Sequence, residues 1–315
     1  MDMFDSLSTP RIIYMGTPEI SATCLEKLLE AGFNVVAVVS NEDKEVGRKR
    51  ILTPTPVKEV ALRHGIPVHQ PHKIRLEHDF LKQYNPDLII TFAYGQIVPK
   101  EVLEAPRYGC LNLHGSLLPE YRGAAPMQRA IFDGKKETGV TLMEMAEKMD
   151  AGRMYAKKLF PIEEEDNYTA VSKKMSIAAS SLMIESLLPY LNGELRGEEQ
   201  DESKVSFANK IKPEEERLDL GMDAEALLCH IRGLSEEPGG YLLLKGEPLK
   251  IFKAKLLNND EKHPIGTIIQ ADKRLIFQAK GGEVEVFDLQ LRGKKRMEAR
   301  SFLNGAHNLA GETLL

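Results

Sequence analysis

The chain has 315 residues, 42% of them hydrophobic and 28% charged, which excludes a disordered chain and provides enough apolar material for two compact cores. Its three cysteines, Cys24, Cys110 and Cys229, lie far apart without a Cys-x-x-Cys pair, so we expect neither a disulfide framework nor a zinc site. The first ten residues lack the basic flank of a signal peptide and no apolar stretch is long enough to span a bilayer, so we expect a cytoplasmic protein without a membrane partner.

The beginning of the chain predicts a strand, a turn, a helix and a second strand. Residues 11–15 form a short apolar run, Gly16-Thr-Pro18 interrupts it, and apolar residues then recur at helical spacing from Ile20 to Ala31. Residues 34–39 follow as a continuous apolar run, which suits a strand buried on both faces of a parallel sheet. The turn has one glycine where a dinucleotide-binding fold has three, which argues against a nicotinamide-dependent dehydrogenase.

The alternation of strand and helix continues along the chain. Further strands are predicted at residues 87–92, 110–113 and 139–145, with helical segments between them. This alternation predicts an α/β fold with a doubly wound, mostly parallel sheet. Such sheets bind ligands at the carboxyl ends of their strands, so the residues that follow each apolar run are candidates for a functional site.

Asn112 and His114 stand at the end of one predicted strand. Side chains two residues apart on an extended segment point to the same face, so an amide and an imidazole would converge on one substrate atom. Asp150, two residues before Gly152, follows the next predicted strand, and its carboxylate would hold the imidazole in one tautomer and stabilise its charged form. Taken singly, the Asn-x-His pair is equally compatible with hydrogen-bonded packing, and the aspartate with a turn.

The longer motif around these residues is more specific. Asn-x-His-Gly-Ser-Leu-Leu-Pro at 112–119 is followed by Tyr-Arg-Gly-Ala-Ala-Pro at 121–126 and later by Asp-x-Gly at 150–152. In this combination the chain resembles the folate-dependent formyltransferase family. Other stretches that carry the resemblance are Gly47-Arg48, Pro54–Lys58, Tyr94–Pro99, Ala208–Arg217 and Leu291–Arg296.

The resemblance implies two domains. A formyltransferase catalytic domain with a Rossmann-like sheet is expected at 1–190, a linker at 191–207, and a smaller C-terminal domain at 208–315. In the family this second domain is an OB-like β-barrel that binds tRNA, and the short β-rich runs between turns from Gly239 to Phe287 agree with a barrel. Residues 245–300 contain 13 Lys and Arg against 8 Asp and Glu, a surplus that favours a polyanionic partner.

The resemblance also implies an enzyme that transfers the formyl group of 10-formyltetrahydrofolate to the amino group of methionine on initiator methionyl-tRNA, and so supports translation initiation. Attack of an amine on a formamide carbon places negative charge on the formyl oxygen, for which Asn112 and a protonated His114 are suitable donors. His114 would also pass protons toward the leaving folate nitrogen, with Asp150 orienting its ring. No metal ion and no obligate protein partner are implied.

Two sets of binding residues follow from the resemblance. The residues expected to form the folate cleft are Tyr94, Gly95, Ser116, Leu117, Leu118 and Pro119. Those expected to contact RNA phosphate or stacked bases are Arg48, Lys49 and Arg50, in the long loop after the strand at 34–39. Loops of this length in compact domains are often functional.

Other functions fit part of the sequence. A formyltransferase for an amino sugar nucleotide or another small amine would share Asn112, His114 and Asp150 but would require neither the C-terminal domain nor the basic loop. A formyl-folate hydrolase would not need a basic second domain, and a formyl-folate dehydrogenase would need a much longer chain. A non-catalytic RNA-binding module would explain the basic tail but would leave the Asn-x-His and Asp-x-Gly motifs without a role.

Overall fold

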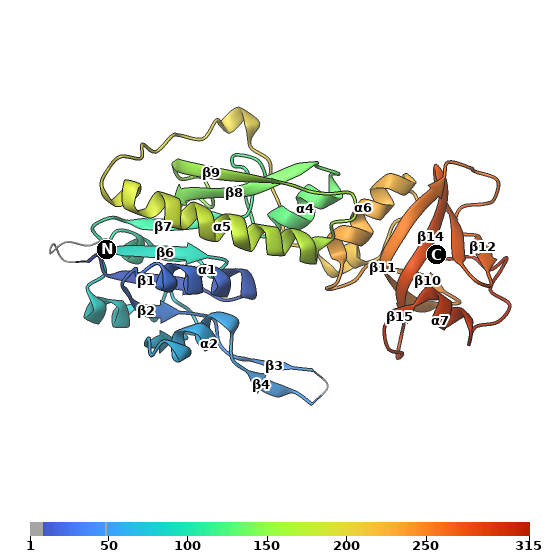
Figure 1. Cartoon of the computed structure of the whole chain (residues 1–315), viewed down its shortest axis with the longest axis horizontal. Coiled ribbons are helices and arrows are strands. Elements are labelled where there is room, and N and C mark those ends of the chain that lie inside the picture. Colours follow the sequence, from blue (N-terminus) through green and yellow to red (C-terminus); the bar gives the residue numbers. More distant parts are fainter. Residues whose placement is uncertain (1–8, 48) are drawn as a thin grey trace. The chain divides into compact units, whose positions relative to one another are not determined.

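The computed structural model describes residues 9–47 and 49–315, which form two compact units. The first unit comprises the described residues up to Gly123 together with Glu137–Phe160 and Ser172–Phe207. The second unit comprises Ala124–Lys136, Pro161–Val171 and Ala208–Leu315. Each unit therefore combines segments that are distant in the sequence, and these can be followed by their colours in Figure 1.

A seven-stranded sheet in the order β5-β2-β1-β6-β7-β8-β9 forms the centre of the first unit (Figure 1). Its strands are β1 (Ile12–Gly16), β2 (Val35–Val39), β5 (Val68–His69), β6 (Leu88–Phe92), β7 (Cys110–His114), β8 (Glu137–Glu144) and β9 (Met154–Pro161). The strands from β5 to β7 are parallel, and β8 pairs with β7 in the antiparallel direction. The doubly wound, mostly parallel sheet predicted from the sequence is confirmed.

The core of the first unit is formed by the strands and helices that the apolar runs and the helical spacing predict. Its helical elements are α1 (Glu19–Glu30), α2 (Pro56–Arg63), α3 (Lys100–Leu103), most of α5 (Tyr168–Leu191), and the 3-10 helices η1 (Asp79–Tyr84) and η2 (Glu202–Lys204). All five residues of β1 are buried. A Cβ atom on Gly16, at the end of β1, would lie 1.8 Å from Ser21 Oγ and 2.9 Å from the carbonyl oxygen of Phe92, so the turn into α1 requires glycine.

The second unit contains an antiparallel sheet of six strands in the order β10-β11-β14-β13-β12, with β15 paired to β14. The strands are β10 (Tyr241–Leu244), β11 (Glu247–Asn258), β12 (Ile268–Ala271), β13 (Leu275–Ala279), β14 (Gly282–Leu291) and β15 (Met297–Glu298). Register shifts between β11 and β14 bend the long strands. The sheet curls into a half-barrel (Figure 1), so the expectation of a smaller barrel-like domain is confirmed.

Helices complete the core of the second unit. They are α4 (Pro126–Phe132), α6 (Ala224–Leu234), α7 (Ala299–Leu303) and the 3-10 helix η3 (Pro213–Glu216). Leu227 and Ile231 of α6 are completely buried in one apolar cluster with Phe277 of β13. The imidazole ring of His230 on α6 stacks on the ring of Phe132 on α4, with ring centres 4.1 Å apart. Helix α4, from the middle of the chain, therefore belongs to the core of the second unit.

The chain passes from the first unit to the second at several points. The last passage falls between Phe207 and Ala208, and the residues 191–207 belong to the first unit. The domain limits given in the sequence analysis stay a prediction. Across the described part of the chain, no helix combines the length and the apolar character needed to cross a membrane.

Candidate active site

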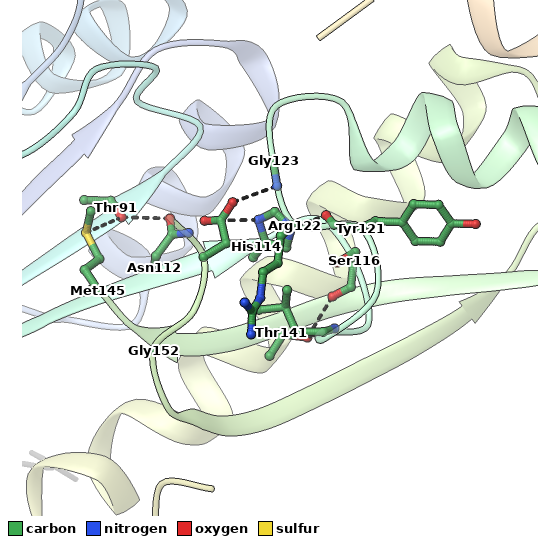
Figure 2. A network of polar contacts seen from close by, with 12 residues as sticks. Thr91, Asn112, His114, Ser116, Tyr121, Arg122, Gly123, Thr141, Met145 and Gly152 are labelled. Atoms are coloured by element: carbon green, nitrogen blue, oxygen red, sulfur yellow. Dashed lines mark hydrogen bonds and ion pairs between the residues drawn. The ribbon is translucent and has the colours of Figure 1, made fainter. Parts of the chain in front are cut away.

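Strand β7 presents Asn112 and His114 at its carboxyl end (Figure 2). Asn112 is the register partner of Thr91 on β6, and Thr91 Oγ1 donates a hydrogen bond to Asn112 Oδ1 at 2.8 Å. In this arrangement the amide oxygen is the acceptor. Within the described residues the amide nitrogen of Asn112 has no acceptor, so it is free to donate to a ligand.

His114 is 5% exposed and its ring is held through Nε2. Nε2 lies 2.8 Å from the carbonyl oxygen of Tyr121. A carbonyl oxygen only accepts, so Nε2 carries a hydrogen and the neutral ring has its lone pair on Nδ1. The Tyr121 carbonyl therefore sets the tautomer, a role that the sequence analysis gave to Asp150.

Asp150 faces the other ring nitrogen of His114. Its Oδ1 lies 3.7 Å from His114 Nδ1, while its Oδ2 accepts a hydrogen bond of 2.9 Å from the backbone N–H of Gly123. The distance to Nδ1 is too long for a hydrogen bond but short enough for an ion pair. When Nδ1 is protonated, the cationic ring of His114 lies beside the carboxylate of Asp150. Because the carboxylate is too far away to accept the hydrogen on Nδ1, this hydrogen stays available to a substrate.

Steric restrictions of the backbone explain the residue types in the Asp-x-Gly motif. Asp150 has a φ of 50°, a left-handed conformation that aspartate adopts more readily than most residues. Two residues later, a Cβ atom on Gly152 would lie 1.9 Å from the carbonyl oxygen of Glu144, so only glycine fits. The turn that aims the carboxylate at His114 therefore depends on both residues.

The segment 116–119, predicted to contact folate, is held tightly by the protein. Ser116 Oγ donates to the Glu120 carbonyl at 2.6 Å, and Thr141 Oγ1 donates to the Ser116 carbonyl at 2.7 Å. Ser116 and Leu118 are completely or nearly completely buried, whereas Leu117 and Pro119 are partly exposed. Of the four predicted residues, Leu117 and Pro119 therefore have side-chain surface for a ligand.

Tyr94 and Gly95, also predicted to contact folate, follow strand β6. The Tyr94 side chain is 4% exposed and packs in an apolar cluster with Met15 and Val39, where burial raises the pKa of its phenol. Its carbonyl oxygen accepts from Asn41 Nδ2 at 2.7 Å. Gly95 is exposed and has a φ of 85°, so the backbone at Gly95 is the part of this pair that a ligand can reach.

Two of the residues predicted to contact tRNA, Lys49 and Arg50, lie on a hairpin of β3 (Lys44–Val46) and β4 (Ile51–Thr53). Arg48 lies outside the described residues. Lys49 and Arg50 are exposed in the turn, and Arg50 Nε forms an ion pair of 2.7 Å with Glu45. The hairpin thus presents cations to solvent, at some distance in sequence from Asn112 and His114.

Several residues of the site escaped the sequence analysis. Thr91 could have been identified from the sequence as a site residue, because it is a polar residue near the carboxyl end of an apolar run. The role of the Tyr121 carbonyl could not be identified from the sequence, since every residue has a carbonyl. Gln200, whose amide donates to the Asp150 carbonyl at 2.8 Å, lies 50 residues away from it in the chain. Among the described residues there is no group of three or more His, Cys, Asp or Glu side chains that could hold a metal ion.

Comparisons with known proteins indicate the same family over most of the chain. The family model described as Formyl transferase matches residues 10–187, and the one described as Formyl transferase, C-terminal domain, matches residues 210–307. The chain is 46% identical over 308 residues to the methionyl-tRNA formyltransferase of Bacillus subtilis (strain 168), with 96% of this chain and 97% of the relative covered. It is 45% identical over 300 residues to that of Halalkalibacterium halodurans, with 94% and 95% covered.

A solved structure has the same fold. HypX from Aquifex aeolicus in complex with tetrahydrofolic acid matches with a TM-score of 0.66 and 19% sequence identity. The match covers 97% of this chain and 51% of HypX. At this identity the likeness shows the fold alone.

Proposed function

Because this chain belongs to the formyl transferase family, we propose that it transfers the formyl group of 10-formyltetrahydrofolate to the amino group of methionine on initiator methionyl-tRNA. One observation carries the chemistry. A free amide donor, Asn112 Nδ2, and a buried imidazole beside a carboxylate stand together at the end of β7. These groups suit a reaction in which negative charge develops on a carbonyl oxygen.

Asn112 stabilises that charge. The neutral amine attacks the formyl carbon, a C–N bond forms, and the formyl oxygen becomes negative. Asn112 Nδ2 donates to this oxygen, and one such donor is worth about 2.7 to 4 kcal/mol in the transition state. Its partner Thr91 keeps the amide from rotating, so the donor is oriented before the substrate binds.

His114 transfers the protons that the reaction requires. The attacking nitrogen must lose a proton, and the folate nitrogen must gain one when its bond to the formyl carbon breaks. Nε2 is committed to the Tyr121 carbonyl, so Nδ1 is the nitrogen that gives a proton to the leaving group and regains one from the attacking nitrogen. Asp150 stabilises the cationic ring before the first of these transfers and again after the second.

We assign the substrate contacts to the exposed parts of the predicted segments. The folate contacts fall to the backbone of Gly95 and to the partly exposed Leu117 and Pro119. The tRNA contacts fall to Lys49 and Arg50 on the β3–β4 hairpin, with Arg48 beside them in the sequence. Because initiator methionyl-tRNA is used in translation, we propose that the chain acts in the cytoplasm.

The tRNA substrate is favoured over a small amine. The relatives that are 45–46% identical along nearly the whole chain are methionyl-tRNA formyltransferases, and a separate family model covers residues 210–307. The second unit and the basic hairpin are both explained by a large polyanionic substrate.

A substrate comparison tests the proposal. The purified chain is incubated with 10-formyltetrahydrofolate and either initiator methionyl-tRNA, elongator methionyl-tRNA or an amino sugar nucleotide, and formylated product and released folate are measured. We expect rapid formylation of the initiator tRNA and slow or no reaction with the other two. Formylation of the amino sugar nucleotide at a higher kcat/KM than the initiator tRNA would overturn the assignment.

A further inference from the structure

The end of the first unit binds both loops that hold His114. In residues 200–206, Ser206 Oγ accepts from the backbone N–H of Tyr121 at 2.9 Å, and the Ser206 carbonyl accepts from that of Arg122 at 2.9 Å. Gln200 binds the other loop, the one that carries Asp150. The two groups that face the imidazole, the Tyr121 carbonyl and the Asp150 carboxylate, are thus supported by the same short segment.

Both the nitrogen and the oxygen of the Gln200 side-chain amide form hydrogen bonds with the loops around His114. It is 8% exposed, and Nε2 donates to the carbonyl oxygens of Asp150 and Gly152, both at 2.8 Å. Its Oε1 accepts from Arg122 Nε at 3.0 Å. The amide therefore joins the Asp-x-Gly turn to the loop that follows Tyr121, and no part of it remains free for another role.

We infer that Gln200 is a positioning residue for formyl transfer, which holds the Asp150–Gly152 turn so that the Asp150 carboxylate faces His114 Nδ1. The turn needs such support because Asp150 has a left-handed φ of 50°. The carboxylate lies 3.7 Å from Nδ1, so a small displacement of the turn changes the charge that the ring experiences. This inference rests on the proposed function, because it acts through the same histidine.

A purely structural role is the competing explanation. Arg122 is 1% exposed, and its guanidinium pairs with Gln200 and, through Nη2 at 2.8 Å, with Glu202. Gln200 would then matter only as an acceptor for a buried cation. The two explanations separate at the amide nitrogen, because Arg122 uses only Oε1 whereas the Asp150 turn uses only Nε2.

The substitution Gln200→Glu exploits this difference. A glutamate keeps the length of the side chain and an acceptor for Arg122, but it replaces the two donated hydrogens by an oxygen that faces two carbonyl oxygens. We expect kcat for initiator methionyl-tRNA to fall by about tenfold to a hundredfold, since small displacements of catalytic groups have effects of this size. KM for tRNA and for the formyl donor should change little, because Gln200 is 8% exposed and its amide is bound by protein groups.

A matched control is Gln278, a glutamine of the second unit. It is also buried, and its Nε2 donates to the carbonyls of Asp260, Ala279 and Gly282. Gln278→Glu should lower the melting temperature in the same way as a change at Gln200, but it should leave kcat near the parent value. A comparable loss of kcat in both variants would overturn the inference.

A double-mutant cycle gives the second readout. In an Asp150→Ala background the carboxylate is gone, so Gln200→Glu should lower kcat by less than about twofold further. An undiminished effect in that background, a parent-like kcat for Gln200→Glu alone, or unfolding of Gln200→Glu at the assay temperature would each overturn the inference. The parent enzyme serves as the reference: if it does not formylate initiator methionyl-tRNA, the proposed function fails first.

Discussion

The site at the end of β7 and the β3–β4 hairpin carry the two groups of functional residues, and they are held in opposite ways. His114 is 5% exposed, with both ring nitrogens facing protein atoms, whereas the Arg50 side chain is 81% exposed beside one carboxylate. Chemistry requires groups that are oriented before the substrate arrives. Binding of a polyanion requires cations that solvent and phosphate can both reach.

This difference predicts how each region responds to substitution. A change in the buried site should act on turnover, because the neighbouring groups are fixed and do not compensate. A change on the hairpin should act on the affinity for tRNA and should depend on salt. The following tests are ordered from the largest expected effect to the smallest.

The largest effect is expected for His114→Ala. Removal of the ring takes away the proton relay and one positive charge, so kcat should fall by about a hundredfold or more. Binding of the formyl donor should be largely retained, because the folate contacts proposed for Gly95, Leu117 and Pro119 remain. Turnover and folate affinity are measured beside His72→Ala, a change at a histidine whose side chain is 68% exposed. A folded His114→Ala enzyme with parent turnover would remove the residue from the mechanism.

Asp150→Asn should have the next largest effect. The substitution keeps the size of the side chain and an acceptor for the Gly123 N–H, but it removes the charge that faces His114 Nδ1. We expect kcat to fall by about tenfold to a hundredfold with little change in KM. The control is Asp79→Asn, at an exposed ion pair with Lys82 in the same unit. Equal kcat values for parent and Asp150→Asn across the pH range would show that the pairing plays no part.

Substitutions on the hairpin should affect tRNA binding. Arg50→Ala and Lys49→Ala should each raise KM for tRNA several-fold, leave the affinity for the formyl donor unchanged, and reduce the slope of log KM against log salt by about one for each lost phosphate contact. Arg48→Ala belongs to the same series. Lys82→Ala, at an exposed lysine of the same unit, is the control. A salt slope identical to that of the parent in all three variants would contradict the assignment.

The smallest effect is expected at the base of the hairpin. Lys58 Nζ and Gln70 Nε2 each donate to Asp43 at 2.6 Å, and the hydrogen bond from Lys58 lowers the pKa of the Asp43 carboxyl below its ordinary value of 3.8. A lowered pKa contributes stability above the ordinary value, and this contribution is lost as the pH falls through the lowered pKa. Asp43→Asn should therefore reduce the free energy of unfolding by up to about 1 kcal/mol at pH 7 and by less at pH 3.

Thermal unfolding of the parent and of Asp43→Asn at both pH values measures this effect. The difference in melting temperature should shrink from pH 7 to pH 3. A difference that grows in acid would mean that the Asp43 carboxyl is stabilised in its protonated form, which contradicts the contacts with Lys58 and Gln70. Activity on tRNA, measured at pH 7, should change less than it does for Arg50→Ala.

The sequence determined the layout of the first unit and the identity of its polar groups. Continuous apolar runs such as residues 35–39 favour strands with both faces buried, and their alternation with helical spacing favours a parallel sheet. The spacing of Asn112 and His114 then places both side chains on one face at the carboxyl end of β7. These results depend on local periodicity, which a sequence records directly.

The tertiary structure alone decided how these groups are held. The tautomer of His114 depends on a backbone carbonyl, and the Asp150 turn depends on a side chain 50 residues away. Likewise, Ala124–Lys136 belongs to the second unit although its first three residues are the end of the motif at 121–126. Backbone groups are the same in every residue, and pairing across such separations leaves no periodic trace in the chain. Their partners are therefore defined only when the whole fold brings them together.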